Sequence, residues 1–201
     1  MEVLNKTARK KTDAGFSLLE LIIAMGITLA VMTAASTLLA TSLRTRSREN
    51  TRSEALASAQ RALNIMTREI GNSGYGLTDN GIVTADSAAN SIRVRANLNN
   101  DTDLSDTDED VRFVFQGVNG SSSPIVRVDN AGDSVVLATN ITGLKISYLD
   151  ISGVAVTAAT AERINIDVLV NLPATAEQPL SQVHLVSDVA LRNGPNTLQQ
   201  F

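Results

Sequence analysis

The feature that most constrains this chain is an apolar run near its N-terminus that contains one charge. From Phe16 to Leu43 the chain has 28 residues, and Glu20 is the only one with a formal charge. A helix of about 20 residues crosses a hydrocarbon core roughly 30 Å thick, so this run is long enough to span a membrane. An unpaired carboxylate at the centre of a bilayer costs roughly 2.5 kcal/mol or more. We therefore expect a membrane helix in which Glu20 has a partner.

The two flanks of this run predict its orientation. The segment before it is basic, with positive charges at Lys6, Arg9, Lys10 and Lys11. The positive-inside rule keeps such a flank in the cytoplasm, so the rest of the chain is expected on the periplasmic side of the inner membrane. Arginines also follow the run, at Arg44, Arg46, Arg48 and Arg52. We interpret them as side chains that extend to the far interface of the membrane.

The helical pattern continues beyond the apolar run. Apolar residues recur at steps of three and four, at Leu56, Ala59, Leu63, Met66 and Ile70. This spacing places them on one face of an amphipathic helix. We therefore expect a single helix from 16 to about 70, with a membrane half at 16–43 and a periplasmic half with its terminal turn at 44–76. Its end is predicted by three glycines, Gly71, Gly74 and Gly76.

Beyond residue 76 the apolar period changes from helical to alternating. Alternation of this kind predicts strands at 92–98, 111–115, 144–148, 163–172 and 181–191. Glycines predict the turns of an antiparallel sheet, at Gly117, Gly120, Gly132, Gly143 and Gly153. No second long helical pattern follows, so the sheet must cover its apolar face with the first helix. The predicted fold class is α+β, a lollipop whose long helix, transmembrane in its first half, packs on an antiparallel β-sheet head at 77–201.

Composition argues against catalysis and against nucleic-acid binding. The net charge is -4 and only 3% of the residues are aromatic, so neither a basic field nor base-stacking platforms are expected. The chain has no cysteine, which excludes disulfides, thiolate zinc sites and a cysteine nucleophile. His184 is the only histidine, and nothing near it resembles a nucleophile elbow. We interpret His184 as an exposed or edge-strand residue and expect no enzyme.

The start of the chain resembles a known protein family. A basic leader, Gly15 and then "FSLLE" opening a long apolar helix are similar to the N-terminal signature of type IV pilins and type II secretion pseudopilins. The resemblance implies that a prepilin peptidase removes the leader at 1–15 by cutting after Gly15 and methylates Phe16. A conventional secretory signal would be cut after the apolar run instead. The resemblance also implies that Glu20 pairs with the methylated N-terminal amine of a neighbouring subunit, which compensates its charge after assembly.

One segment resembles the PilW-type minor pilins within this family. "RALNIMTREIGNSGYGL" at 61–77 is similar to the end of that group's long helix. This implies a minor pilin of a type IV pilus that joins other minor and major pilins, and the pilus assembly platform, to prime or cap the filament at its tip. Two alternatives stay open: a type II secretion pseudopilin, and an anchored periplasmic calcium-binding or adhesive module. Many pilins have a proline in the apolar helix and this chain has none from 16 to 70, so melting near Gly26 is also open.

An acidic segment between two predicted strands offers a candidate metal site. The first, third, fifth and seventh places of a calcium loop are filled by Asn97, Asn99, Asp101 and Asp103. The place of the bidentate glutamate holds Asp108, and Thr102 stands where a glycine is usual. Calcium is thus the one candidate cofactor, and none is required for the predicted function. The alternative is a solvated acidic loop that keeps a strand edge soluble.

Overall fold

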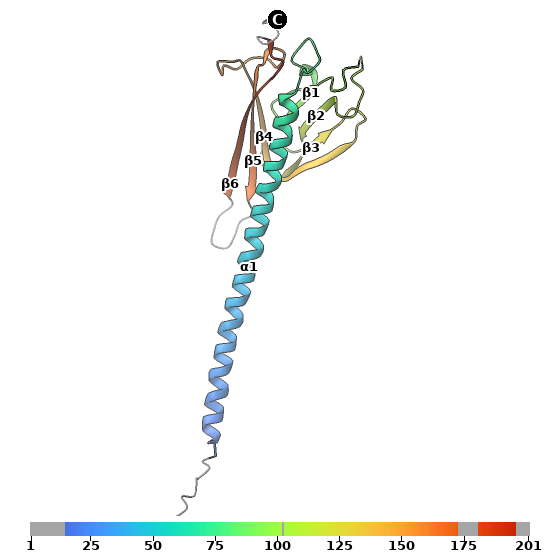
Figure 1. Ribbon diagram of the computed structural model, residues 1–201. Coiled ribbons are helices and arrows are strands. Elements are labelled where there is room, and N and C mark those ends of the chain that lie inside the picture. The colour runs from blue at the N-terminus through green and yellow to red at the C-terminus, as the bar shows by residue number, and fades with distance from the viewer. Residues whose placement is uncertain (1–14, 102, 173–180, 196–201) are drawn as a thin grey trace, which may run out of the picture. The chain divides into compact units, whose positions relative to one another are not determined.

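The longest element is the helix α1 (Leu18–Gly71), which contains 54 residues (Figure 1). The computed structural model describes residues 15–101, 103–172 and 181–195. Helix α1 confirms the single helix predicted from 16 to about 70, although it begins two residues later. The predicted leader lies outside the described residues, apart from Gly15. The chain divides into two compact units, residues 1–47 and 48–201, and α1 contributes to both.

In the first unit, the part of α1 that carries the apolar run is exposed along its whole length. By length and composition this part is able to cross a membrane. Its threonine hydroxyls donate to carbonyl groups of the preceding turn, for example Thr28 to Ala24 at 2.7 Å and Thr33 to Leu29 at 2.8 Å. Bonds of this kind satisfy polar groups within the helix itself, as hydrocarbon requires. The run therefore carries these two threonines without unpaired hydroxyls.

The described residues of the second unit form one six-stranded sheet in which all neighbouring strands are antiparallel. The strands are β1 (Ser91–Arg95), β2 (Asp110–Phe115), β3 (Ser123–Val128), β4 (Ser134–Leu149), β5 (Arg163–Leu172) and β6 (Ser181–Ala190). Two short 3-10 helices, η1 (Thr84–Asp86) and η2 (Ala158–Thr160), lie in the connections. Strands that are neighbours in space are also neighbours in the chain, so the sheet is a meander with β1 and β6 at its edges.

The second half of α1 covers one face of this sheet (Figure 1). Its buried residues are Ala55, Ala59, Ala62, Leu63, Met66 and Ile70. Alternate residues of β5, the strand next to the edge strand β6, meet them in the core, and all are fully buried: Ile164, Ile166, Val168 and Val170. Burial of each large side chain contributes about 1.5 to 3 kcal/mol. These contacts confirm the predicted α+β fold, a long helix packed on an antiparallel sheet.

The third strand is absent from the sequence prediction. Ile125 and Val126 of β3 are consecutive in the chain and both are buried, which breaks the alternation that identifies a strand. The pairing of β3 with β4 changes register between these two residues. Ile125 belongs to the hydrophobic core beneath α1 and Val126 is buried outside that core, so two apolar neighbours are buried in different surroundings. The pattern of alternating apolar residues therefore fails to predict β3, although β3 pairs with a strand on each side in the sheet.

Two other strand boundaries differ from the prediction. The predicted strand at 144–148 is only the end of β4, and Gly143 lies inside that strand rather than in a turn. A register shift between Ile141 and Gly143 accounts for a glycine there, because an irregular strand position tolerates a residue without a side chain. Strand β1 ends at Arg95, so the predicted strand at 92–98 is too long. The strands predicted at 163–172 and 181–191 are confirmed.

The glycine-rich segment after α1 ends the helix as predicted. Gly74 and Gly76 adopt positive φ angles of 78° and 71°. A Cβ on Gly81 would lie 2.2 Å from the backbone nitrogen of Gly74, so the two chain segments can meet only because both residues lack a side chain. The contact holds the turn against β1, where Gly74 N donates to Arg95 O and Arg95 N donates to Gly81 O, both at 2.8 Å.

Candidate functional site

Glu20 lies in the first turn of α1. The carbonyl of Ser17 accepts a hydrogen bond from the backbone of Leu21 at 3.1 Å, and the helix begins at Leu18. Ser17 is therefore at the N-cap position and Glu20 is the third helical residue, which is the spacing of a capping box. A carboxylate in the first turn also interacts favourably with the helix dipole, by about 0.3 to 1 kcal/mol. The capping-box pattern Ser-x-x-Glu is present in the sequence. The interpretation of Glu20 only as the partner of a neighbouring subunit does not take this local role into account.

The predicted cleavage point lies just before the helix. Gly15, Phe16 and Ser17 are exposed and have no regular secondary structure, and 85% of Phe16 is accessible to solvent. A Cβ built on Gly15 would meet no described atom within 4 Å. Among the described residues, therefore, nothing near Gly15 obstructs the approach of a second protein to the bond between Gly15 and Phe16.

The apolar run presents a continuous hydrophobic surface. Fourteen of its large hydrophobic side chains are more than half exposed: Phe16, Leu18, Leu19, Leu21, Ile22, Ile23, Met25, Ile27, Leu29, Val31, Met32, Leu38, Leu39 and Leu43. Soluble monomers rarely expose contiguous apolar patches larger than a few hundred Å². This surface is consistent with burial among lipid or other apolar helices, and Glu20 lies within it.

The comparison with protein families concerns this same segment. Residues 10–36 match the prokaryotic N-terminal methylation motif. The match includes the predicted cleavage pair Gly15 and Phe16, and Glu20 five residues after the glycine. It supports the resemblance to type IV pilins and pseudopilins, and it covers 27 of the 201 residues. No curated protein and no solved structure matches the chain.

The second candidate site is the acidic loop that joins β1 to β2. Its side chains form a ladder of turns in which each Oδ1 accepts the backbone N–H two residues later. Asn99 accepts from Asp101 at 3.0 Å, Asp101 from Asp103 at 2.8 Å, and Asp103 from Ser105 at 2.9 Å. The hydroxyl and the backbone N–H of Ser105 hold the pKa of Asp103 below its ordinary value. Three of the predicted calcium ligands are thus adjacent along the ladder.

The other two predicted ligands have different surroundings. Asn97 is buried and its Nδ2 donates to the carbonyl of Asp101 at 2.6 Å. Asp108 is bound by Arg127 at 2.7 Å, and Arg127 also binds Glu69 of α1 at 3.0 Å. Within the described part of the chain, which leaves out Thr102, no three acidic or histidine side chains converge to hold a metal.

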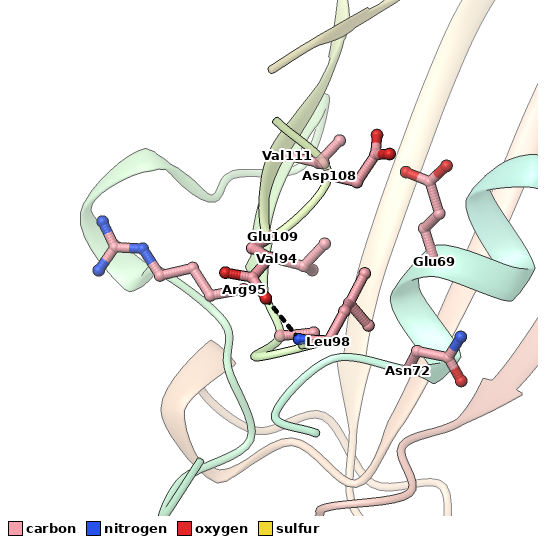
Figure 2. A pocket seen from close by; sticks show the side chains of 9 residues that line it. Glu69, Asn72, Val94, Arg95, Leu98, Asp108, Glu109 and Val111 are labelled. Carbon is pink, nitrogen blue, oxygen red and sulfur yellow. Dashed lines mark hydrogen bonds between the residues drawn. The ribbon is translucent and has the colours of Figure 1, made fainter. Parts of the chain in front are cut away.

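Glu109 is the residue that the sequence interpretation missed. It is only 3% exposed, and its Oε1 accepts hydrogen bonds from the backbone of Leu98 at 2.6 Å and of Asn99 at 3.2 Å. Figure 2 shows this carboxylate beside Leu98, with Glu69 and Asn72 across the pocket. The pocket holds about 50 Å³, room for one or two waters or an ion but not for an organic substrate.

Asp110, the acid that follows the loop, is neutralised by two arginines of β1. Arg93 binds Asp110 through Nε at 2.6 Å and through Nη2 at 2.9 Å, and Arg95 binds it at 2.8 Å. Burial raises the pKa of Asp110, but the hydrogen bonds and positive charges of the two arginines lower it by more, so its pKa lies below its ordinary value. Asp110 is therefore committed to the strand pair.

His184 lies on the edge strand β6 and its side chain is 63% exposed, which confirms the prediction for this residue. Its Nδ1 is 3.0 Å from Oδ1 of Asp167 on β5. The pair borders an open hollow of about 210 Å³ that Lys145 and Thr142 also line. The hydroxyl of Thr142 donates to the carbonyl of Leu169 and accepts from Gln182, so its bonds are directed within the sheet.

Proposed function

We propose that this chain is a pilin-like structural subunit of a filament. A prepilin peptidase removes the leader after Gly15 and methylates Phe16, and the apolar half of α1 holds the precursor in the inner membrane. The same half then packs among the helices of other subunits. The observation that carries the proposal is the methylation motif at 10–36, which contains Glu20, the only charge of the apolar run.

The physical basis is the exchange of lipid contacts for contacts with other helices. Apolar helices in lipid gain little hydrophobic free energy from one another, so their association depends on packing and on polar pairs. Glu20 supplies one partner of such a pair, and the methylated amine of Phe16 in a neighbouring subunit supplies the other. The pair sets the register between subunits because it forms at one axial offset only.

The PilW resemblance supports a narrower proposal, in which this subunit is a minor pilin that primes or caps a type IV pilus alongside other minor and major pilins and the assembly platform. A type II secretion pseudopilin would use the same chemistry in another machine, and the neighbouring genes separate the two. In a permanently anchored calcium-binding or adhesive module, the leader would not be cut. Mass spectrometry of the mature N-terminus distinguishes that case, since the pilin-like subunit begins at a methylated Phe16.

The decisive variant is Glu20→Gln. Glutamine also satisfies a capping box, so this change removes the charge and retains the local role in the helix. Removal of one partner of a buried pair costs about 3 kcal/mol or more, which lowers an association constant about 100-fold. We expect a precursor that is inserted and processed normally but is almost absent from the sheared surface filaments or secretion pseudopili.

The matched control is Glu54→Gln, which removes an exposed glutamate of the same helix outside the apolar run. It should leave filament incorporation unchanged. Glu20→Ala and Glu20→Leu remove both roles and should be at least as defective as Glu20→Gln. Wild-type incorporation of Glu20→Gln together with loss in Glu20→Ala would assign Glu20 to helix capping and refute the pairing.

A further inference from the structure

The loop at 97–109 carries more negative charge than its ion pairs neutralise. Asp108 is paired with Arg127. In the part of the loop that the structure describes, the other acids form no ion pair with lysine or arginine: Asp101, Asp103, Asp106 and Glu109. An amide N–H already bridges two of them, because Nδ2 of Asn99 donates to Oδ2 of Asp101 and to Oδ2 of Asp106, both at 2.8 Å. The carboxylates of Asp101 and Asp106 are therefore held close to the same amide group.

Two oxygen atoms, one at each end of this loop, are buried and lack a donor. They are Oδ1 of Asn97 and Oε2 of Glu109, in side chains that are 8% and 3% exposed. Both side chains are held in the loop by their other atom, since Asn97 Nδ2 donates to Asp101 O and Glu109 Oε1 accepts from Leu98 N. The Glu109 contact is drawn in Figure 2. Burial of a carboxylate oxygen without a donor is unfavourable, and a bound cation removes that penalty.

We propose that this loop binds a calcium ion through Asn97 Oδ1 and Glu109 Oε2. The remaining ligands come from oxygens of the alternating residues Asn99, Asp101 and Asp103. Carboxylate and amide oxygens without sulfur or imidazole favour a hard cation, and calcium tolerates the irregular geometry of a loop better than magnesium does. The side chains of Asp101 and Asp103 are exposed and turn toward the two buried oxygens when the ion binds.

The structure changes one member of the ligand set that the sequence suggests. Asp108 occupies the place of the bidentate glutamate by spacing, but its carboxylate is bound to Arg127 and is 73% exposed. Glu109, one residue later, is the acid that is buried in the loop. The site is independent of the proposed assembly function, because it uses no residue of α1 and applies equally to an anchored module.

The test measures calcium binding to the full chain in detergent after removal of metal with a chelator. At 1 mM CaCl₂ the unfolding midpoint should rise by about 1 to 5 °C, and 1 mM MgCl₂ should leave it nearly unchanged. Titration calorimetry should give a dissociation constant of about 0.1 to 1 mM, the range of extracellular calcium modules. Absence of both heat and midpoint shift at 5 mM calcium would overturn the proposal.

Variants then identify the ligands. Glu109→Gln keeps an acceptor for Leu98 N and should weaken calcium binding at least tenfold. Asp101→Asn combined with Asp103→Asn changes exposed side chains only, so it should weaken binding similarly without lowering the midpoint in chelator. Asp133→Asn removes an exposed acid outside the loop and is the charge control. Asp108→Asn should bind within about twofold of wild type. Wild-type affinity in Glu109→Gln, or loss of affinity in Asp108→Asn, would refute the assignment.

Discussion

The amide of Asn80 joins two segments that are far apart in the chain. Its Nδ2 lies within hydrogen-bond distance of the carbonyls of Ala158 at 2.9 Å and Ala161 at 3.2 Å, and its Oδ1 accepts from Ile82 N at 3.2 Å. The residue is 3% exposed. The segments that connect strands have no neighbouring strand to bond with. A buried side chain can therefore supply the hydrogen bonds that their backbone groups need. The partly buried Asn193 lies similarly in the turn after α1, where its Nδ2 is within hydrogen-bond distance of the carbonyls of Gly74 at 2.6 Å and Leu77 at 2.9 Å.

We predict that Asn80→Ala lowers the free energy of unfolding by about 2 to 3 kcal/mol, because buried carbonyls lose their donor. Asn119→Ala is the control, since Asn119 is exposed, and its effect should stay within about 0.5 kcal/mol. Urea unfolding of the full chain in detergent, followed by circular dichroism, measures both. Equal stability of the two variants would show that the Asn80 bonds contribute nothing net.

The candidate site residues were predictable to different degrees. Gly15, Phe16 and Glu20 are readable because they fall within the N-terminal methylation motif, and a motif of this kind is linear in the sequence. Asn97 and Asp103 follow from the spacing of oxygen ligands. Glu109 was not predictable, because its importance depends on burial, and an acidic run gives no sign of which member faces inward.

Helix α1 is one element with two kinds of surface. Its first half is apolar on every side and exposed, and its second half has an apolar stripe that is buried against the sheet. Helix propensity does not distinguish them, since both halves use residues that form helices well. The distribution of apolar residues around the axis decides which half packs within the molecule.

A pair of methionines on this helix tests that division. Met66 is fully buried in the head core, and Met32 is 67% exposed in the apolar run. Met66→Ala should lower the free energy of unfolding of the head by about 2 to 5 kcal/mol, because it removes buried contacts and leaves a cavity. Met32→Ala should change it by less than about 0.5 kcal/mol. Thermal unfolding of the detergent-solubilised chain, monitored through the strand signal, would contradict this division if Met32→Ala were the more damaging change.

All of the hydrophobic core found in the described residues lies in one of the two units. The buried hydrophobic residues of the described chain run from Ala55 to Leu191, all within the unit that begins at residue 48. We predict that a fragment of residues 45–201 is soluble without detergent and unfolds in a single cooperative transition. A fragment of residues 61–201 lacks Ala55 and Ala59 and should aggregate or unfold without a transition. Calorimetry of both fragments checks this, and a stable shorter fragment would show that those helix contacts are dispensable.

The sequence alone determined the features that depend on order along the chain. These are the apolar run with its single charge, the helix that continues to Gly71, the alternating strands β5 and β6, and the N-terminal methylation motif. Only the tertiary structure decided which residues are buried together. The bulged strand β3, the place of Gly143 inside β4, the pairing of Asp108 with Arg127 and the buried oxygens of Asn97 and Glu109 arise from contacts between distant segments. The periodicity of a sequence shows which face of a single helix or strand is apolar. These features depend on contacts between two elements, so periodicity does not predict them.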